Sequence, residues 1–272
     1  MKTHQIVFIG AGYIASALIK GLINQGYPAN KITATSPVAA ELAALADATG
    51  IQTTTDNNQA ASQADLLVLA VKPQIMAQVC QQLATSLTDK TLVISLAAGI
   101  TCQQLTGWLD KPQLPLVRAM PNTPALVGAG ITGLFAPRTL VEQQQQQVEA
   151  LIGAVGQLVW VEQEAALNSV TAISGSGPAY YFLFTEALAQ AGKQLGLTPA
   201  TALQLAQATA TGAGQLMQAS QEHPSQLRQQ VTSPGGTTQA ALEVFMQEGL
   251  EKLVLSAAQA AVTRAEELSQ AN

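Results

Sequence analysis

Short runs of consecutive hydrophobic residues alternate with amphipathic stretches along the first 163 residues. Hydrophobic runs without polar interruptions are typical of strands that are buried on both faces. The stretches between them repeat hydrophobic residues three and four positions apart, as helices that cover a sheet do. The alternation therefore predicts a parallel sheet with helices on both faces. We expect strands over 5–10, 31–36, 65–71, 90–99, 114–120, 128–137 and 156–162, and helices over 15–25, 39–48 and 73–87.

The strand pattern ends near Gln163, and the remaining residues have the spacing of helices. Pro178 and Pro199 stand where proline is favoured, in the first turn of a predicted helix. Because these helices are rich in Ala, Leu and Gln, their hydrophobic faces are broad enough to be buried against a second subunit. We expect helices over 164–174, 178–195, 199–219, 225–231, 236–248 and 249–270. The chain is thus expected to form an α/β domain, residues 1–163, and an all-helical domain that self-associates, residues 164–272.

Charge and cysteine content argue against several classes of partner. The 272 residues carry a formal net charge of −5 and have no basic run, so we expect no nucleic-acid partner. Cys80 and Cys102 have neither metal-site spacing nor the number needed for a disulfide framework, which favours a reduced, cytoplasmic protein without a metal. The longest hydrophobic run, residues 66–71, is far shorter than the roughly 20 residues that span a bilayer, so no membrane partner is expected.

A glycine motif connects the first strand to the first helix. Gly10, Gly12 and Ala15 form the pattern G-x-G-x-x-A, which binds dinucleotides only where it follows a strand and opens a helix, as it does here. Gly10 permits the tight turn, Gly12 lets the backbone approach a pyrophosphate, and Ala15 permits close packing of the helix on the sheet.

The end of the second strand bears on which dinucleotide binds. An NAD-specific site places Asp or Glu there, to bind the ribose 2′-hydroxyl. This chain has Thr33, Thr35 and Ser36 instead, and hydroxyls can hydrogen-bond to a 2′-phosphate. We expect NADPH, with NADH as the alternative. Further strands end in "AVKP" (70–73), "SLAAG" (95–99) and "MPNTP" (120–124), so Lys72 is expected on the cofactor rim.

The scarcity of acids among the candidate residues favours reduction of a C=N bond. Reduction of a ketone creates an alkoxide and needs a positioned general acid. Among the candidate acids, His4 and His223 are expected at the surface, before the first strand and in a turn. Tyr27 and Lys31 precede the second strand, at the wrong edge of the sheet. A protonated imine already carries the charge that hydride neutralises, so it needs alignment more than an acid.

The uncharged segment "VTSPGGTTQAAL" (231–242) predicts a small anion site within the helical half. Ser233 is expected to cap a helix and Pro234 to be its first residue. The unpaired N–H groups of that first turn, beside Gly235 and Gly236, could hold an anion without an Arg.

The motifs "GAGYIASALIKGL", "AVKP", "AAG", "MPNTP", "SGSGPAY" (174–180) and "VTSPGGTT" resemble, in this order, those of delta-1-pyrroline-5-carboxylate reductases. The resemblance covers about residues 5–268 and implies a Rossmann domain with a helical dimerisation domain, often assembled into decamers. It implies reduction of L-1-pyrroline-5-carboxylate to L-proline with NADPH or NADH. It places the substrate carboxylate at Ser233, Gly236 and Thr237, and the Thr238 hydroxyl at the ring nitrogen. We therefore expect Thr238 and Lys72 as the catalytic residues, and Gly235 beside the other substrate residues. The resemblance places the cofactor at Gly10, Gly12, Tyr13, Ile14, Thr35, Ser36, Asn57, Ala70, Val71, Lys72, Pro73 and Ala98.

Two positions depart from the family pattern, and two other functions stay open. Tyr13–Ile14 replace the common Asn-Met or Gln-Leu, and Pro37 stands where many bacterial members have Arg, which leaves the choice between NADPH and NADH open. A beta-hydroxyacid dehydrogenase would need a catalytic Lys early in the first long helix, where this chain has none before Lys193. A non-catalytic NADP-binding sensor would bind the cofactor without reducing any imine or keto acid.

Overall fold

The computed structural model describes residues 3–220 and 222–271. The chain divides into two compact units. The first runs to Ser176 and includes the residues from Ala261 onward, and the second spans Gly177–Ala260.

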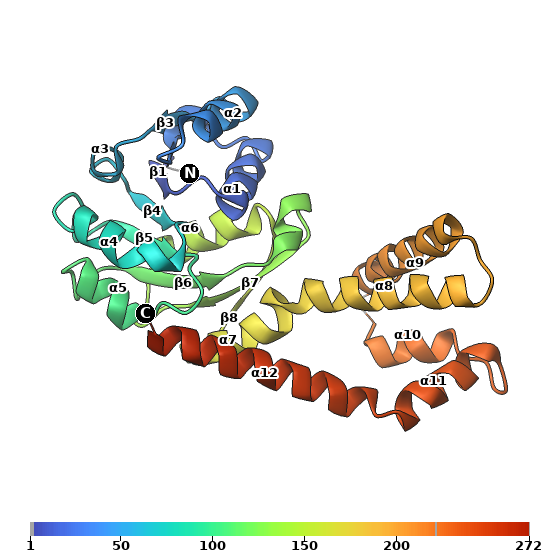
Figure 1. The fold of residues 1–272 in the computed structure, drawn as a ribbon. Coiled ribbons are helices and arrows are strands. Elements are labelled where there is room, and N and C mark those ends of the chain that lie inside the picture. The colour runs from blue at the N-terminus through green and yellow to red at the C-terminus, as the bar shows by residue number, and fades with distance from the viewer. Residues whose placement is uncertain (1–2, 221, 272) are drawn as a thin grey trace. The chain divides into compact units, whose positions relative to one another are not determined.

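An eight-stranded sheet with the order β3-β2-β1-β4-β5-β6-β7-β8 forms the centre of the first unit (Figure 1). This order confirms the predicted Rossmann-type α/β class. Seven strands follow the predicted runs, whereas β3 was not predicted because it is short and polar. The strands are β1 (Ile6–Ile9), β2 (Ile32–Thr35), β3 (Gln52–Thr54), β4 (Leu66–Leu69), β5 (Leu92–Ser95), β6 (Leu116–Met120), β7 (Gly130–Phe135) and β8 (Gly156–Trp160).

The expectation of an entirely parallel sheet is wrong at β7, which pairs antiparallel with β6. A parallel connection needs a crossover of a dozen or more residues, and residues 121–129 are too few. They form instead a short 3₁₀ turn, Thr123–Val127, that returns the chain along β6. β8 then pairs parallel with β7.

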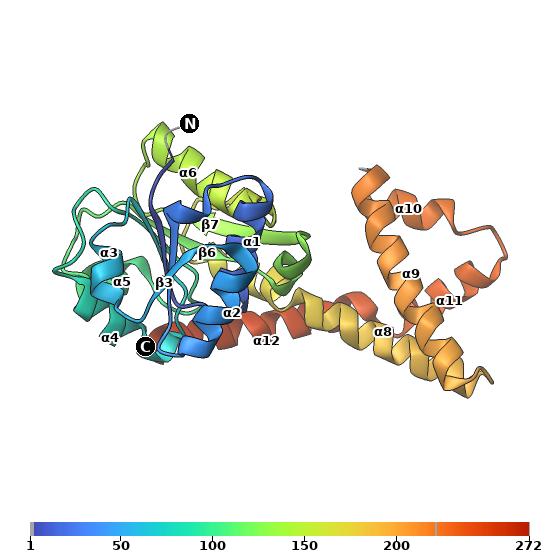
Figure 2. The same ribbon diagram turned by 90° about the horizontal axis from the view of Figure 1, so that it is seen from above.

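Helices cover both faces of the sheet, as Figure 2 shows for α3, α4 and α5 on one side. Alternate strand residues point to opposite faces, so Phe8 packs with one helical layer and Val7 with the other. The Phe8 layer consists of α1 (Tyr13–Asn24), α2 (Ala39–Thr49) and α6 (Glu142–Gly153). The Val7 layer consists of α3 (Asn57–Ala61), α4 (Pro73–Leu83) and α5 (Cys102–Trp108).

The chain leaves the sheet through a short helix with an unusual end. α7 (Ala166–Val170) continues into a π-helical turn, Thr171–Gly175, and π turns are frequent at functional sites. The last turns of α12 (Leu250–Ala271) also belong to this unit, where Ala265 is buried.

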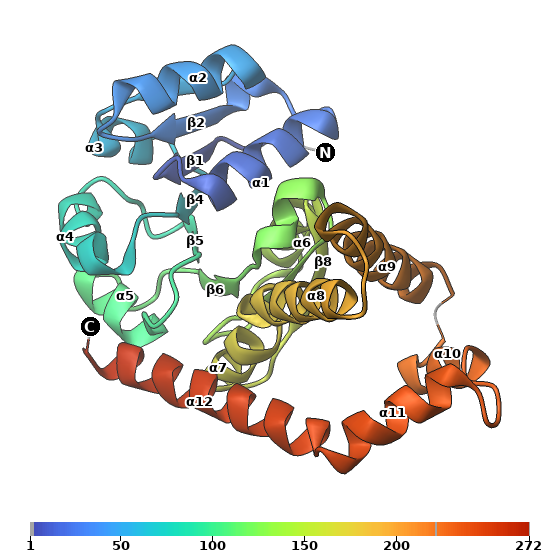
Figure 3. The same cartoon turned by 45° about the vertical axis from the view of Figure 1, so that its right-hand side comes forward.

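The second unit consists of helices alone, which confirms the predicted helical half. α8 (Gly177–Gln194) and α9 (Pro199–Ser220) pack side by side (Figure 3). α10 (Pro224–Gln230), α11 (Thr237–Gln247) and the first part of α12 follow. Within the described residues, no helix is both long and apolar enough to cross a membrane.

Large hydrophobic side chains are exposed along α8. Tyr181, Phe182 and Leu183 are 69%, 68% and 66% exposed, whereas Phe184 lies with its ring centroid 6.0 Å from that of Phe245. A row of exposed hydrophobic side chains on one helix is typical of a protein–protein surface. This surface agrees with the predicted self-association through the helical half.

Candidate active site

The glycine loop adopts the conformation that the motif predicts. Gly10 has a φ of +104°, and a Cβ there would lie 2.8 Å from the Ala70 carbonyl oxygen, so only glycine fits. Its N–H donates to the Thr35 carbonyl at 3.0 Å, which joins the loop to β2. Ala15 is 1% exposed, in the close contact between α1 and the sheet.

Gly12 leaves room for a ligand at the start of α1. It is the N-cap residue, and a Cβ built on it meets nothing within 4 Å. The first turn contains no acid and has no side-chain cap, so no carboxylate of the helix itself competes for its N–H groups or the positive end of its dipole. This arrangement fits the pyrophosphate of a dinucleotide, with Tyr13 and Ile14 directly beside it.

At the end of β2, two adjacent hydroxyls have different environments. The Thr35 side chain is 1% exposed, and within the described residues its Oγ1 has no hydrogen-bond partner. The Ser36 hydroxyl accepts from the Val38 N–H and donates to Oε2 of Glu41, both at 3.2 Å. A carboxylate therefore lies at the corner where a dinucleotide ribose is expected.

The register of the sheet brings three further loops to the edge of the glycine loop. The Ala70 N–H donates to the Ile9 carbonyl and the Leu96 N–H to the Leu69 carbonyl, each at 2.9 Å. Ala70–Pro73 and Ala98 thus lie on the edge that carries Gly10. Lys72 is exposed as the N-cap of α4, and Asn57 is half-buried as the first residue of α3.

Asn122 joins two loops of the same unit and was not predicted as a site residue. Its Nδ2 donates to the Ser174 carbonyl at 3.1 Å, and its Oδ1 accepts from the Ile131 N–H at 3.0 Å. A Cβ on Gly175 would lie 2.7 Å from Cε of Met120, so the π turn packs tightly against the end of β6. Asn122 is buried, and its side-chain amide fixes the loop "MPNTP" against the turn.

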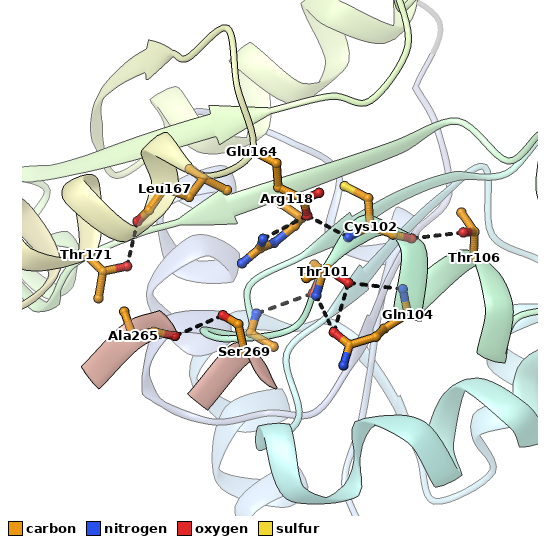
Figure 4. Close-up of polar contacts among 12 residues, drawn as sticks. Thr101, Cys102, Gln104, Thr106, Arg118, Glu164, Leu167, Thr171, Ala265 and Ser269 are labelled. Atoms are coloured by element: carbon orange, nitrogen blue, oxygen red, sulfur yellow. Dashed lines mark hydrogen bonds and ion pairs between the residues drawn. The ribbon is translucent and has the colours of Figure 1, made fainter. Parts of the chain in front are cut away.

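A partly buried ion pair, with the Glu164 side chain 29% exposed, supports the segment that follows the Ala98 loop (Figure 4). Nη1 of Arg118, on β6, lies 2.8 Å from Oε1 of Glu164, and the same oxygen accepts from the Cys102 N–H at 2.6 Å. Burial and then the Glu164 carboxylate raise the pKa of the Cys102 thiol, so this cysteine is a protonated structural residue. The pair fixes the start of α5 directly after the loop.

The prediction that Ser233 caps a helix is wrong, because α11 begins four residues later, at Thr237. The Gly236 N–H donates to the Ser233 carbonyl at 3.0 Å, and Gly235 has a φ of +70°. Proline followed by a glycine of positive φ is typical of a type II turn, which Ser233–Gly236 forms between α10 and α11. The N-cap of the helix is Gly236.

The start of α11 nevertheless has the form of an anion site. The N–H groups of Thr237, Thr238 and Gln239 have no intrahelical acceptor, and Gly236 has no side chain to accept from them. The Gly235 N–H is already used, since it donates to Oε1 of Gln239 at 2.7 Å. The Thr238 side chain is half-buried one residue into the helix.

The groups that were dismissed as catalysts are engaged elsewhere. The Tyr27 hydroxyl donates to the His4 carbonyl at 2.6 Å, beside a cavity of about 480 Å³ at the amino edge of the sheet. His223 caps α10 by accepting from the Ser225 N–H. Neither arrangement resembles an acid directed at a substrate.

A sheet of this order with an open glycine loop at β1 defines the class of dinucleotide-dependent oxidoreductases. Residues 5–99 match the family model "NADP oxidoreductase coenzyme F420-dependent", and residues 164–268 match "Pyrroline-5-carboxylate reductase dimerisation". The pyrroline-5-carboxylate reductase of Pseudomonas aeruginosa is 46% identical over 99% of this chain and 98% of its own. The chain therefore belongs to the pyrroline-5-carboxylate reductase family.

Solved structures agree with this assignment. A pyrroline-5-carboxylate reductase from Coxiella burnetii superposes with a TM-score of 0.93 at 45% identity, covering 98% of this chain and 99% of that one. The Plasmodium falciparum pyrroline carboxylate reductase, solved with NADP bound, superposes with a TM-score of 0.84 at 27% identity, covering 99% of both chains. These matches confirm the expected family, the two-part fold and a nicotinamide cofactor.

Proposed function

We propose that the protein reduces L-1-pyrroline-5-carboxylate to L-proline with NADPH or NADH, the last step of proline synthesis. The observation that carries this proposal is that two helix starts have glycine N-caps, Gly12 and Gly236, in a chain whose full-length relatives are pyrroline-5-carboxylate reductases. One start suits a pyrophosphate and the other suits a carboxylate.

The predicted cofactor residues hold the dinucleotide along the sheet edge. The first turn of α1, with Gly10, Gly12, Tyr13 and Ile14, takes the pyrophosphate. Thr35, Ser36 and Asn57 take the adenosine side, where Thr35 contributes its backbone because its side chain is buried. Ala70, Val71, Lys72, Pro73 and Ala98 lie on the nicotinamide side. NAD(P)H, when bound, supplies the hydride.

The turn before α11 holds the substrate carboxylate. Ser233, Gly235, Gly236 and Thr237 surround it, and the backbone N–H groups at the helix start donate to its oxygens. Since this segment carries no charge, attraction comes from the N–H groups and the helix dipole. The protonated ring nitrogen then brings the positive charge with the substrate.

Thr238 orients the reacting bond. Its hydroxyl faces the ring nitrogen and accepts a hydrogen bond from the iminium N–H. Hydride adds to the imine carbon, and the C=N π electron pair moves to nitrogen. The Thr238 hydroxyl stays hydrogen-bonded to the resulting amine. Lys72, exposed at the rim, is the second catalytic candidate and places a positive charge on the nicotinamide side.

We infer a functional boundary at residue 163, with the cofactor domain over 1–163 and the substrate-binding, dimerising domain over 164–272. The helical half matches a dimerisation model, and the exposed side chains of α8 supply a hydrophobic surface for it. Dimers that assemble further into decamers are the proposed state, in the cytoplasm. Light scattering after size exclusion would distinguish the dimer from the decamer.

The test is oxidation of NADPH and NADH, followed by absorbance, on addition of the cyclic imine. Thr238→Ala should lower kcat about 100-fold, as loss of an orienting hydrogen-bonding group does, with unchanged cofactor affinity. The matched control is Thr232→Ala, whose hydroxyl donates to the Arg228 carbonyl at 2.6 Å in the same loop. Oxidation of neither cofactor, or full activity of Thr238→Ala, would contradict the proposal.

A further inference from the structure

The Glu41 carboxylate lies where a cofactor's adenosine ribose is expected, and none of the roles assigned above uses it. Glu41 stands in the first turn of α2, and its Oε2 accepts from the Ser36 hydroxyl at 3.2 Å. Ser36 directly follows β2, whose carboxyl end adjoins the glycine loop through the bond from Gly10 to Thr35. In dinucleotide-binding sheets, this corner contacts the 2′ position of the ribose.

The hydrogen bonds of Ser36 restrict what it can offer to a 2′-phosphate. A serine hydroxyl has a single hydrogen, and here that hydrogen is donated to Glu41. The hydroxyl oxygen also accepts from the Val38 N–H at 3.2 Å. A 2′-phosphate, which needs donors, can take the Ser36 hydrogen only by displacing the Glu41 carboxylate.

The surrounding charges do not compensate for this carboxylate. From Ile32 to Asn57 the sequence contains neither Lys nor Arg, whereas it contains Glu41, Asp47 and Asp56. The positive end of the α2 dipole is the remaining attraction for an anion, and Glu41 already lies in its first turn. A 2′-hydroxyl, in contrast, can donate a hydrogen bond to the free oxygen of the same carboxylate.

We infer that Glu41 determines the cofactor preference by opposing the 2′-phosphate of NADPH and accepting the 2′-hydroxyl of NADH. The inference rests on the proposed function, because it assigns the adenosine to this corner. With Glu41 present, the protein uses NADH more readily than it would if Thr35 and Ser36 alone lined the site. Removal of the charge at position 41 therefore shifts the preference toward NADPH.

Equilibrium binding measures this effect without turnover. Titration of the intact protein with NADPH and with NADH, followed by nicotinamide fluorescence, gives both Kd values. In Glu41→Gln, which keeps an acceptor for Ser36, the ratio of the NADPH Kd to the NADH Kd should fall about tenfold, as expected for loss of one charge at short range. In Glu41→Ala, which also frees the Ser36 hydrogen, the ratio should fall further.

The matched control is Asp47→Asn, which removes the same charge from an exposed position of the same helix. Asp47 lies six residues further on, roughly 9 Å along the helix axis, where salt screens most of the interaction. Its Kd ratio should change less than twofold. As ionic strength rises, the Kd ratio of Glu41→Gln should approach that of the wild-type protein.

Two outcomes separate this inference from the proposed function. Unchanged Kd ratios in both Glu41 variants, in a protein that binds both dinucleotides and reduces the cyclic imine, would overturn the role of Glu41 alone. Failure of the wild-type protein to bind either dinucleotide would overturn the proposed function and the role of Glu41 together.

Discussion

The starts of α1 and α11 have the same local form, although they lie in different units. Gly12 has φ and ψ of −68° and −178°, and Gly236 has −83° and 172°, so both are extended N-caps without a side chain. The side chains of Asp56 and Thr101 cap α3 and α5, whereas Val38 at the start of α2 makes no such bond either but presents a valine side chain there. A helix start without a side-chain cap leaves N–H groups for a ligand, and this chain places such starts at its two proposed anion sites.

The two starts differ in what holds them. The loop before α1 is bonded to β2 and packed on the Ala70 carbonyl, so the sheet fixes the position of Gly12. The segment before α11 is a turn whose Gly235 N–H is held by the side chain of Gln239, from the helix it precedes. The start proposed for the large cofactor is thus positioned by the sheet, whereas the start proposed for the small carboxylate is positioned by a local turn.

The largest expected effect is that of Gly12→Asp. A Cβ at Gly12 meets no atom within 4 Å, and Asp is a slightly better N-cap residue than Gly, so the helix should be preserved or stabilised by roughly a few tenths of a kcal/mol. Its carboxylate would occupy the N–H groups and repel the pyrophosphate, and the Kd for NADPH should rise more than about 100-fold. Fluorescence titration and thermal unfolding measure the two effects. Normal NADPH binding would show that the two starts are not equivalent.

A smaller effect is expected for Gly236→Ala. A Cβ there would lie 3.0 Å from the Ser233 carbonyl oxygen, which accepts the hydrogen bond of the turn. Displacement of that carbonyl should raise the KM for the cyclic imine about tenfold, through a loss of roughly 1.4 kcal/mol of binding. The Kd for NADPH should stay the same, and an equal rise in both constants would contradict separate sites.

The smallest effect is expected for Gln239→Ala, which removes the acceptor of the Gly235 N–H. Loss of one exposed hydrogen bond of about 0.5–1 kcal/mol should raise the KM for the imine roughly threefold. Gln239→Glu keeps an acceptor but adds a negative charge beside the substrate carboxylate, and should therefore raise KM more. Steady-state kinetics at saturating NADPH compare the two variants. If the Glu variant retained the wild-type KM, the carboxylate would not bind at this turn.

Hydrophobic pattern was sufficient to predict the buried strands and the long helices. β4, with all four residues buried, follows a continuous hydrophobic run, and α8 and α9 follow helical spacing with proline in the first turn. β3 was missed because Gln52–Thr54 is an edge strand without a buried residue. The reversal at β7 depends on the length of the preceding connection, a signal that the hydrophobic pattern alone does not contain.

The site was predicted best where a backbone conformation requires a particular residue. Gly10 was identified because a tight turn before a helix demands it, and the structure confirms its positive φ. The interpretation of Ser233 as a helix cap was wrong, because Pro234 and Gly235, with a φ of +70°, form a turn before the helix. Glu41 was not predicted because it lies in α2, beyond the strand end, and only the fold brings its side chain back to Ser36, five residues earlier.

The exposed side chains of α8 couple stability to protein concentration. Tyr181, Phe182 and Leu183 expose hydrophobic surface in a single chain. A partner that covers this surface stabilises the folded state by mass action. The helical unit is then more stable in a concentrated solution than in a dilute one. Dilution below the dissociation constant of the assembly would thus weaken the helices that carry the Ser233–Thr238 segment before it affects the dinucleotide-binding sheet.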